Sequence, residues 1–412
     1  MKKNINKSDK GVALITTVVL LFAVMIIVLT GAQLISTSFK ETKFHQNFVA
    51  EAENVARAGL VDTVSWFRRQ GDVVRSGVPP TNPTWEDGAF HPIQIDTDAV
   101  HSATIDESIG LVKEYPLNEA RTKWARYEIK RQQDTPDIDP LAVHDITHQR
   151  VPNHQKGEGL AWSIVSTGYV YRKISIGKFT SPPDVIISKA RVSTEIRRIN
   201  LNNPACAVAV YDGGSGGTYN VKVNKNGRIL GGNNGIGCAR YSGDNAPSVD
   251  SNGILSGLPQ SDTTSNDLSV ISIFGVSELE LKSMADRYDV TVTTPMPDMS
   301  LIYIDGNATF DVSKPLRSSG ILYIKGDLTI AELSNSLYSG LIYVTGDATI
   351  GTPCLIMGCL IVKGKLSLSS SGATDVAEIC YDSQILVDVR NRVCQYRENK
   401  SISHSFKPMT GL

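Results

Sequence analysis

The chain repeats one pattern four times, as SLIYIDGNATF (300–310), SGILYIKGDLTI (319–330), SGLIYVTGDATI (339–350) and GCLIVKGKLSL (358–368). Each segment reads as an apolar strand, a polar residue, a glycine, a second polar residue and a short alternating strand. The central glycines recur at intervals of 20, 20 and 18 residues: Gly306, Gly326, Gly346 and Gly364. A period near 20 with two strands in each unit is typical of the rungs of a β-solenoid. We expect the equivalent apolar side chains of successive rungs to stack: Ile302, Leu322, Ile342 and Leu360.

Three aspartates of the repeat, Asp305, Asp327 and Asp347, adjoin the central glycines. Solenoid enzymes that cleave polysaccharides use carboxylates clustered on one face, so these residues are the candidates for catalysis. Asp beside Gly is also ordinary turn chemistry, which is the interpretation we favour. No Ser-His-Asp or Cys-His arrangement is apparent elsewhere. The sequence therefore predicts no catalytic residues and no enzymatic activity.

The N-terminus begins with a polar, basic segment, MKKNINKSDKG (1–11), and continues with an apolar run over 12–35. A bilayer core needs roughly 20 mostly apolar residues in a helix, so the run is long enough to span. The lysines that precede it predict a cytoplasmic N-terminus. An ordinary secretory signal would have a shorter apolar core ending at an A-x-A-like site. A plain signal anchor remains the alternative.

The helical pattern continues beyond the apolar run. Apolar residues recur at helix-like intervals over 36–69, with charged residues between them. No proline occurs before Pro79. A single helix of about 50 residues is therefore expected, apolar all round in its first half and amphipathic in its second.

Two segments, KGVALITTVVLLFAVMIIVLTGAQL (10–34) and FVAEAENVARAGL (48–60), resemble the N-terminal domain of PilX-type minor pilins. The start is also similar to the K-type pseudopilins of type II secretion. The resemblance implies that prepilin peptidase cuts after Gly11 and that Val12 becomes the first, N-methylated residue. Major pilins carry Glu at the fifth mature position, where this chain has Thr16. The missing carboxylate suits a subunit at the fibre tip, although Thr16 tolerated anywhere in the fibre is the alternative.

A second resemblance to PilX-type pilus assembly proteins covers about 270–385. It comprises FGVS (274–277) leading into ELELKSMADRY (278–288), the repeats, and ICYDS (379–383). A last strand is expected over 387–396.

The middle of the chain is predicted to hold a loop over 71–110 and antiparallel strands over 126–131, 161–173 and 189–199. His144 and His148 stand four residues apart, as metal ligands on a helix would. Nearby prolines favour a solvated loop instead, so no metal site is predicted.

All six cysteines lie in the second half of the chain, and none forms a CxxC pair, which argues against a zinc or redox motif. Disulfides are expected in an exported chain, and six cysteines allow fifteen pairings. Buried free thiols are the alternative. Two cysteines bracket a glycine-rich segment, and a disulfide between them would add roughly 3–4 kcal/mol. The candidates are Cys206, Cys238, Cys354, Cys359, Cys380 and Cys394.

The sequence thus predicts an α+β protein with a long N-terminal pilin-like transmembrane helix, an antiparallel β-sheet head and a C-terminal β-solenoid of the right-handed type. The expected parts are a prepilin leader (1–11), the pilin helix (12–69), the head (70–204), a Gly-rich β-solenoid (205–396) and a polar tail (397–412).

The expected function is that of a type IV minor pilin near the fibre tip, which primes assembly or presents an adhesive domain. A secretion pseudopilus remains open. The expected partners are prepilin peptidase, other pilins through the helix, and a cell-surface or host ligand. Net charge is −1, so no nucleic-acid partner is expected, and no cofactor is. We expect a single-pass inner-membrane protein whose periplasmic C-terminal domain later reaches the pilus or cell surface. The alternatives are an extracytoplasmic polysaccharide enzyme and a bactofilin-like scaffold.

Overall fold

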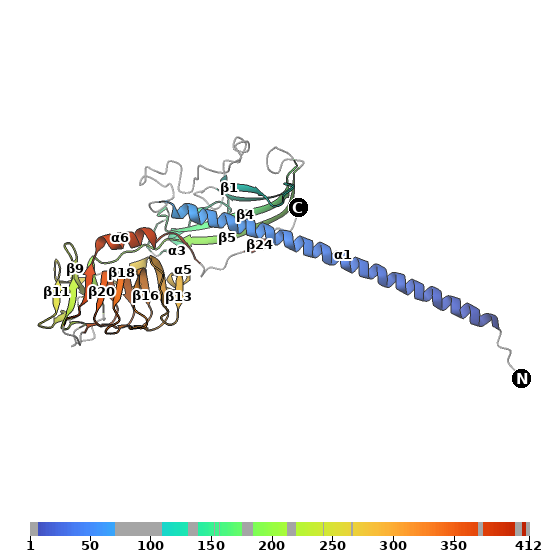
Figure 1. Ribbon diagram of the computed structural model, residues 1–412. Coiled ribbons are helices and arrows are strands. Elements are labelled where there is room, and N and C mark those ends of the chain that lie inside the picture. The colour runs from blue at the N-terminus through green and yellow to red at the C-terminus, as the bar shows by residue number, and fades with distance from the viewer. Residues whose placement is uncertain are drawn as a thin grey trace.

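A computed structural model describes residues 7–70, 109–130, 139–151, 153–155, 157–174, 184–211, 220–241, 243–264, 267–369, 374–399 and 406–408. A long helix leads to an antiparallel sheet, and a domain of parallel strands lies beyond that sheet (Figure 1). The predicted loop over 71–110 lies almost entirely outside the described residues.

Helix α1 runs without interruption from Lys7 to Arg68, over 62 residues. Its N-terminal half extends away from the rest of the molecule (Figure 1). Its C-terminal half buries a single face, with side chains spaced three or four residues apart, as a helical stripe requires. These side chains are Ala52, Val55, Ala56, Leu60, Thr63 and Phe67. The prediction of one continuous helix is confirmed.

The head consists of the C-terminal half of α1 and an antiparallel sheet. The sheet has the order β1 (Ile109–Pro116), β2 (Lys123–Lys130), β4 (Ala161–Arg172) and β5 (Val185–Arg197). Short β3 (His144–Asp145) pairs with β4, and α3 (Thr147–Arg150) follows it. Helix and sheet are in close contact at Gly168, where a Cβ would lie 2.2 Å from the carbonyl oxygen of Ala52. The three predicted head strands are confirmed.

The C-terminal residues return to the head. Strands β23 (Arg397–Glu398) and β24 (Phe406–Pro408) both pair antiparallel with β5. The segment predicted as a polar tail therefore supplies two short strands to the sheet. Tyr396, just before them, is fully buried, with its ring 5.1 Å from Phe67 and its hydroxyl donating to the Gly159 carbonyl at 2.6 Å. This contact joins the end of the chain to the end of α1.

The parallel domain consists of two facing sheets. The larger runs β11-β8-β22-β20-β18-β16-β14-β13, with β6, β9 and β12 joined to it, and the smaller runs β10-β7-β21-β19-β17-β15. The repeat supplies β14 (Ser300–Ile304), β15 (Ala308–Phe310), β16 (Arg317–Ile324), β17 (Leu328–Ile330), β18 (Ser336–Val344), β19 (Ala348–Ile350), β20 (Cys354–Val362) and β21 (Leu366–Leu368). The flanking strands are β6 (Cys206–Val210), β7 (Val221–Val223), β8 (Gly227–Leu230), β9 (Ile236–Tyr241), β10 (Ser248–Val249), β11 (Ile254–Ser256), β12 (Ser261–Thr264), β13 (Arg287–Asp289) and β22 (Ala377–Tyr381).

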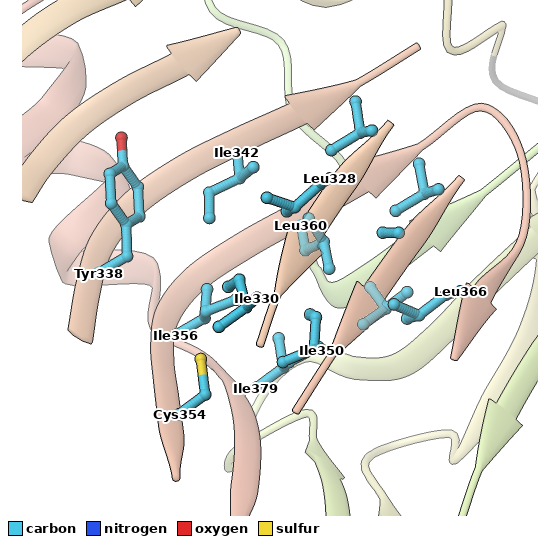
Figure 2. Close-up of a cluster of buried hydrophobic side chains, with 14 of the residues drawn as sticks. Leu328, Ile330, Tyr338, Ile342, Ile350, Cys354, Ile356, Leu360, Leu366 and Ile379 are labelled. Atoms are coloured by element: carbon cyan, nitrogen blue, oxygen red, sulfur yellow. The ribbon is translucent and has the colours of Figure 1, made fainter. Parts of the chain in front are cut away.

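The repeat stacks in the register that its period predicts. Ile302 lies opposite Leu322, Leu322 opposite Ile342, and Ile342 opposite Leu360. These side chains fill the space between the two sheets, together with residues of the smaller sheet such as Leu328 and Ile330 (Figure 2). The predicted stacking of these four side chains is confirmed.

The outer face of the larger sheet carries three short helices, α4 (Val270–Phe274), α5 (Glu278–Met284) and α6 (Ser383–Arg392). Ser277 caps α5 in a capping box with Glu280, at the helix start that the sequence indicated. Helix α6 replaces the strand predicted over 387–396, because the residues that it buries are spaced three and four apart. They are Leu386, Val389 and Val393.

One layer of the parallel domain is assembled from two distant segments. Strand β20 pairs through Cys354–Gly358 with β22 and through Leu360–Val362 with β6. In the smaller sheet, β21 pairs with β7. The glycine-rich strands therefore extend the stack at one end, although they precede the repeat in the chain. The chain crosses back through α4 and α5 before the repeat begins.

Gly340 tests the register of the stack. Its φ is +141°, and a Cβ would lie 2.0 Å from the carbonyl oxygen of Gly320 on the neighbouring strand. We expect Gly340→Ala to lower the free energy of unfolding by about 3 kcal/mol, measured by calorimetry on the detergent-solubilised chain. Gly243→Ala is the control, because a Cβ there meets only the Tyr241 ring, at 3.6 Å. Equal melting temperatures for the two variants would contradict the register.

Candidate functional site

The exposed half of α1 is the first candidate surface. Thr16–Thr37 has a mean hydropathy of 2.7, and no part of this segment is buried. Its 22 residues span about 33 Å as a helix, which matches a bilayer core. Among the described residues it is the one helix long and apolar enough to cross a membrane.

Threonines within this segment bond to the helix itself. The Thr30 hydroxyl donates to the carbonyl of Ile26, and the Thr37 hydroxyl donates to the carbonyl of Gln33 at 2.6 Å. Such bonds keep hydroxyl groups satisfied in an environment without water. The segment is therefore suited to lipid or to the apolar surface of a neighbouring helix.

The predicted processing residues lie at the start of α1. Gly11 and Val12 are in its first turns, and the structure describes only their backbone. Thr16 is exposed at the beginning of the apolar segment. The three residues lie along one helix, and their cleavage and packing roles stay predictions.

The turn aspartates have structural partners. Asp327 Oδ1 accepts from the backbone N–H of Asp347 at 2.9 Å, and Asp347 Oδ1 accepts from that of Lys365 at 2.7 Å. Asn307 begins the series by accepting from the N–H of Asp327 at 2.9 Å. Each side chain therefore caps the turn of the next layer.

The same series explains the repeated glycine. A Cβ on Gly346 would lie 2.1 Å from Asp327 Oδ1, and one on Gly364 would lie 2.2 Å from Asp347 Oδ1. The space of the missing side chain is occupied by the cap from the neighbouring layer. Asn307, which sequence reasoning overlooked, occupies the position equivalent to the two aspartates and is identifiable from the alignment of the repeats.

Asp305 is not equivalent to the other two aspartates, because it precedes its glycine instead of following it. Its carboxylate accepts from Lys282 Nζ at 2.7 Å and from the Tyr288 hydroxyl at 3.0 Å. The hydrogen bond from Lys282 lowers the pKa of Asp305. Grouping the three aspartates as one candidate carboxylate face was therefore wrong.

All six cysteines are free thiols in the structure, in place of the expected disulfides. Cys238 packs between the two sheets, whereas Cys206 packs between the larger sheet and its helices. The two cysteines that bracket the glycine-rich segment therefore lie in different parts of the core. The remaining thiols are Cys354, Cys359 and Cys394, which are buried, and Cys380, which is half-buried.

Burial also suppresses the reactivity of these thiols. It raises the pKa of Cys238, Cys354 and Cys394 from 9.0 to about 12. A raised folded-state pKa favours the protonated thiol, so this contribution to stability is present below pH 9.0 and is lost as the pH rises towards 12.

His144 and His148 were wrongly predicted as loop residues, because both belong to short regular elements. His144 is in β3, with Nδ1 3.0 Å from the Ala142 carbonyl oxygen, and His148 is in α3. Between them, buried Asp145 accepts backbone N–H groups from Thr147 and Gly159. Within the described residues, no group of three His, Cys, Asp or Glu side chains could hold a metal ion.

The end of the parallel domain farthest from α1 is a second candidate surface (Figure 1). We call it the distal end, formed by β10, β11, β12 and their connections over 243–264. It carries a hollow of about 680 Å³ and three exposed apolar side chains, Val249, Ile254 and Leu258. Sequence reasoning did not single it out. The signal that could have found it is a segment without Lys or Arg from Tyr241 to Leu281.

No family model, curated protein or solved structure matches this chain.

The Asp327 cap can be tested by two substitutions. We expect Asp327→Ala to lower the free energy of unfolding by about 1 kcal/mol, because the N–H of Asp347 loses its acceptor. Asp327→Asn should be nearly neutral, because the amide oxygen still accepts, as Asn307 does one layer away. Calorimetry of both variants checks this. Equal losses would show that the charge, and not the cap, matters.

Thiol alkylation tests the cysteine assignments. We expect iodoacetamide at pH 8 to modify Cys380 first in the folded chain, because the other five thiols are buried. Mass spectrometry of the intact folded and unfolded protein gives the count and positions. Six unreactive sulfurs after unfolding without reductant would instead show disulfides in the native protein.

Proposed function

We propose that the chain is a minor pilin or pilin-like subunit of a type IV pilus, processed between Gly11 and Val12 by prepilin peptidase. The helix anchors the subunit in the inner membrane, with its N-terminus in the cytoplasm. It then packs against other pilin helices in the fibre. The head and parallel domain lie in the periplasm and later at the fibre or cell surface.

The observation that carries this proposal is the division of α1. One continuous helix has an exposed apolar half, Thr16–Thr37, and a second half that belongs to the head. A simple anchor needs only the membrane span. A rigid continuation into the folded head lets the position of the helix in a fibre determine the position of the head.

A location at or near the tip is supported by two features. Thr16 stands at the fifth mature position and offers no carboxylate to a neighbouring terminal amine. The parallel domain also extends the head well beyond the end of α1 (Figure 1). Neighbours on both sides along a fibre would have to accommodate this bulk, whereas a terminal subunit would not.

We further propose that the parallel domain is a β-solenoid of the right-handed type, used to display a binding surface. Its support is the parallel register over successive 20-residue repeats. The polysaccharide-enzyme alternative gains no specific support, because Asp327 and Asp347 cap turns and Asp305 pairs with Lys282.

Processing is tested on the protein purified from its native membrane, with and without prepilin peptidase. We expect mass spectrometry to find a chain that begins at N-methylated Val12 only when the enzyme is present. Gly11→Ala should remain largely cleavable, whereas Gly11→Leu should block cleavage by occupying space at the scissile bond. An intact N-terminus in the presence of the enzyme would reduce the helix to a signal anchor.

A further inference from the structure

The two ends of the parallel domain are finished differently. At the end next to the head, Val292 and Met296 are buried and close the space between the two sheets. Arg287 holds their loop by donating to the carbonyls of Thr293 and Pro295, at 2.9 and 2.7 Å. Side chains of the chain itself therefore close the core at this end.

The distal end exposes strand edges instead. Among the described strands, β11 pairs only with β8, β12 only with β9, and β10 only with β7. The Ser256 carbonyl accepts from the N–H of Gly231 at 2.8 Å, so Ser256 faces β8. Backbone groups alternate in direction along a strand, so those of Leu255 face the open side. An added strand would find its hydrogen-bonding partners there.

Apolar side chains surround this edge. The hollow of about 680 Å³ is lined by Val249, Ile254 and Leu255 together with small and polar residues. Val249 is 42% exposed, although it is in register with the buried Val223 and so stands at the end of the core. Ile254, 43% exposed, is in register with Arg228 and points to the outer face of β11. Among the described residues 243–264, no buried apolar side chain closes this end as Val292 and Met296 close the other.

The charge of the distal end favours a basic strand from another protein over a second copy of this chain. Residues 243–264 contain three aspartates and no Lys or Arg, and Asp250 and Asp262 are exposed. Two copies meeting at this edge would bring like charges together. A segment carrying Lys or Arg would instead meet the exposed Asp250 and Asp262. Two basic residues, Lys222 and Arg228, lie one strand further from the edge, and Arg228 is paired with Glu378 at 3.6 Å.

We propose that the distal end binds an extended, basic segment of another protein, which adds as a further strand beside β11 and inserts an apolar side chain between Val249 and Leu255. This mode combines backbone hydrogen bonds for affinity with a side-chain pocket for specificity. This proposal specifies the binding surface of the display role proposed above. It depends on that role only for the direction in which the distal end points.

The probe is a fluorescent peptide, Lys-Val-Thr-Val-Lys-Val-Thr-Val-Lys, compared with the same peptide carrying Glu in place of Lys. Binding to the detergent-solubilised full chain is followed by fluorescence anisotropy. We expect the basic peptide to bind and the acidic one to bind at least tenfold more weakly. The measurement does not involve N-terminal processing, so its failure is distinct from a failure of the pilin proposal.

Ile254→Lys should weaken binding of the basic peptide at least tenfold, because it places a like charge on the edge strand beside which the peptide would add. Leu337→Lys is the matched control. Leu337 is 46% exposed, but its strand, β18, is paired on both sides, so affinity should not change. Sedimentation velocity of the wild type and both variants reports self-association.

Three results would overturn the proposal. One is no binding of the basic peptide up to on the order of 1 mM. The second is equal loss in Ile254→Lys and Leu337→Lys, or equal binding of both peptides, since either would mean nonspecific adsorption. The third is a wild-type oligomer that Ile254→Lys dissociates, which would assign the edge to a second copy of the chain.

Discussion

The in-register contact between neighbouring parallel strands is the constraint on which the rest of the molecule depends. Where Gly320 and Gly340 stack, and where Gly346 meets the Asp327 side chain, there is no room for a Cβ. The register therefore permits one residue type at these positions and places equivalent apolar side chains above one another in the core. A slip by one residue would turn that core outwards.

This regular stack also provides a surface for the irregular segments. Tyr303, Tyr323 and Tyr343 lie in register on the outer face of the larger sheet, with ring centroids 4.8 and 5.2 Å apart. Helices α4 and α5 cover this ladder, and the Tyr343 hydroxyl donates to the Leu268 carbonyl at 2.6 Å. The crossing back of the chain is thereby held against the repeat.

Specific contacts connect the head to the stack. Arg397 pairs with Asp286 at 2.5 Å, Asn200 donates to the Phe274 carbonyl at 3.0 Å, and Tyr396 packs on Phe67. These contacts hold the head against the stack. The apolar segment of α1 thus lies at one end of the molecule and β11 at the other (Figure 1).

Local patterns were sufficient for several elements. The apolar run, the continuous helix, the head strands, the start of α5 and the stacking of the repeat all follow from periodicity, and periodicity acts within one segment. The strand predicted over 387–396 was wrong. The β-branched residues there favoured a strand, whereas the spacing of Leu386, Val389 and Val393 favoured the helix that is observed. Local patterns also grouped Asp305 with Asp327, because adjacency to glycine does not distinguish the two sides of a turn.

By itself, the sequence determined that a long apolar helix precedes a β-rich region with a 20-residue repeat, because local periodicity encodes both. Only the tertiary structure decided that β6 and β22 complete one layer and that the last residues return to the head. It also decided that Cys206 and Cys238 lie in different clusters of the core and that β11 pairs, among the described strands, with β8 alone. These features depend on pairing between segments far apart in the chain, for which a single sequence carries no local signal.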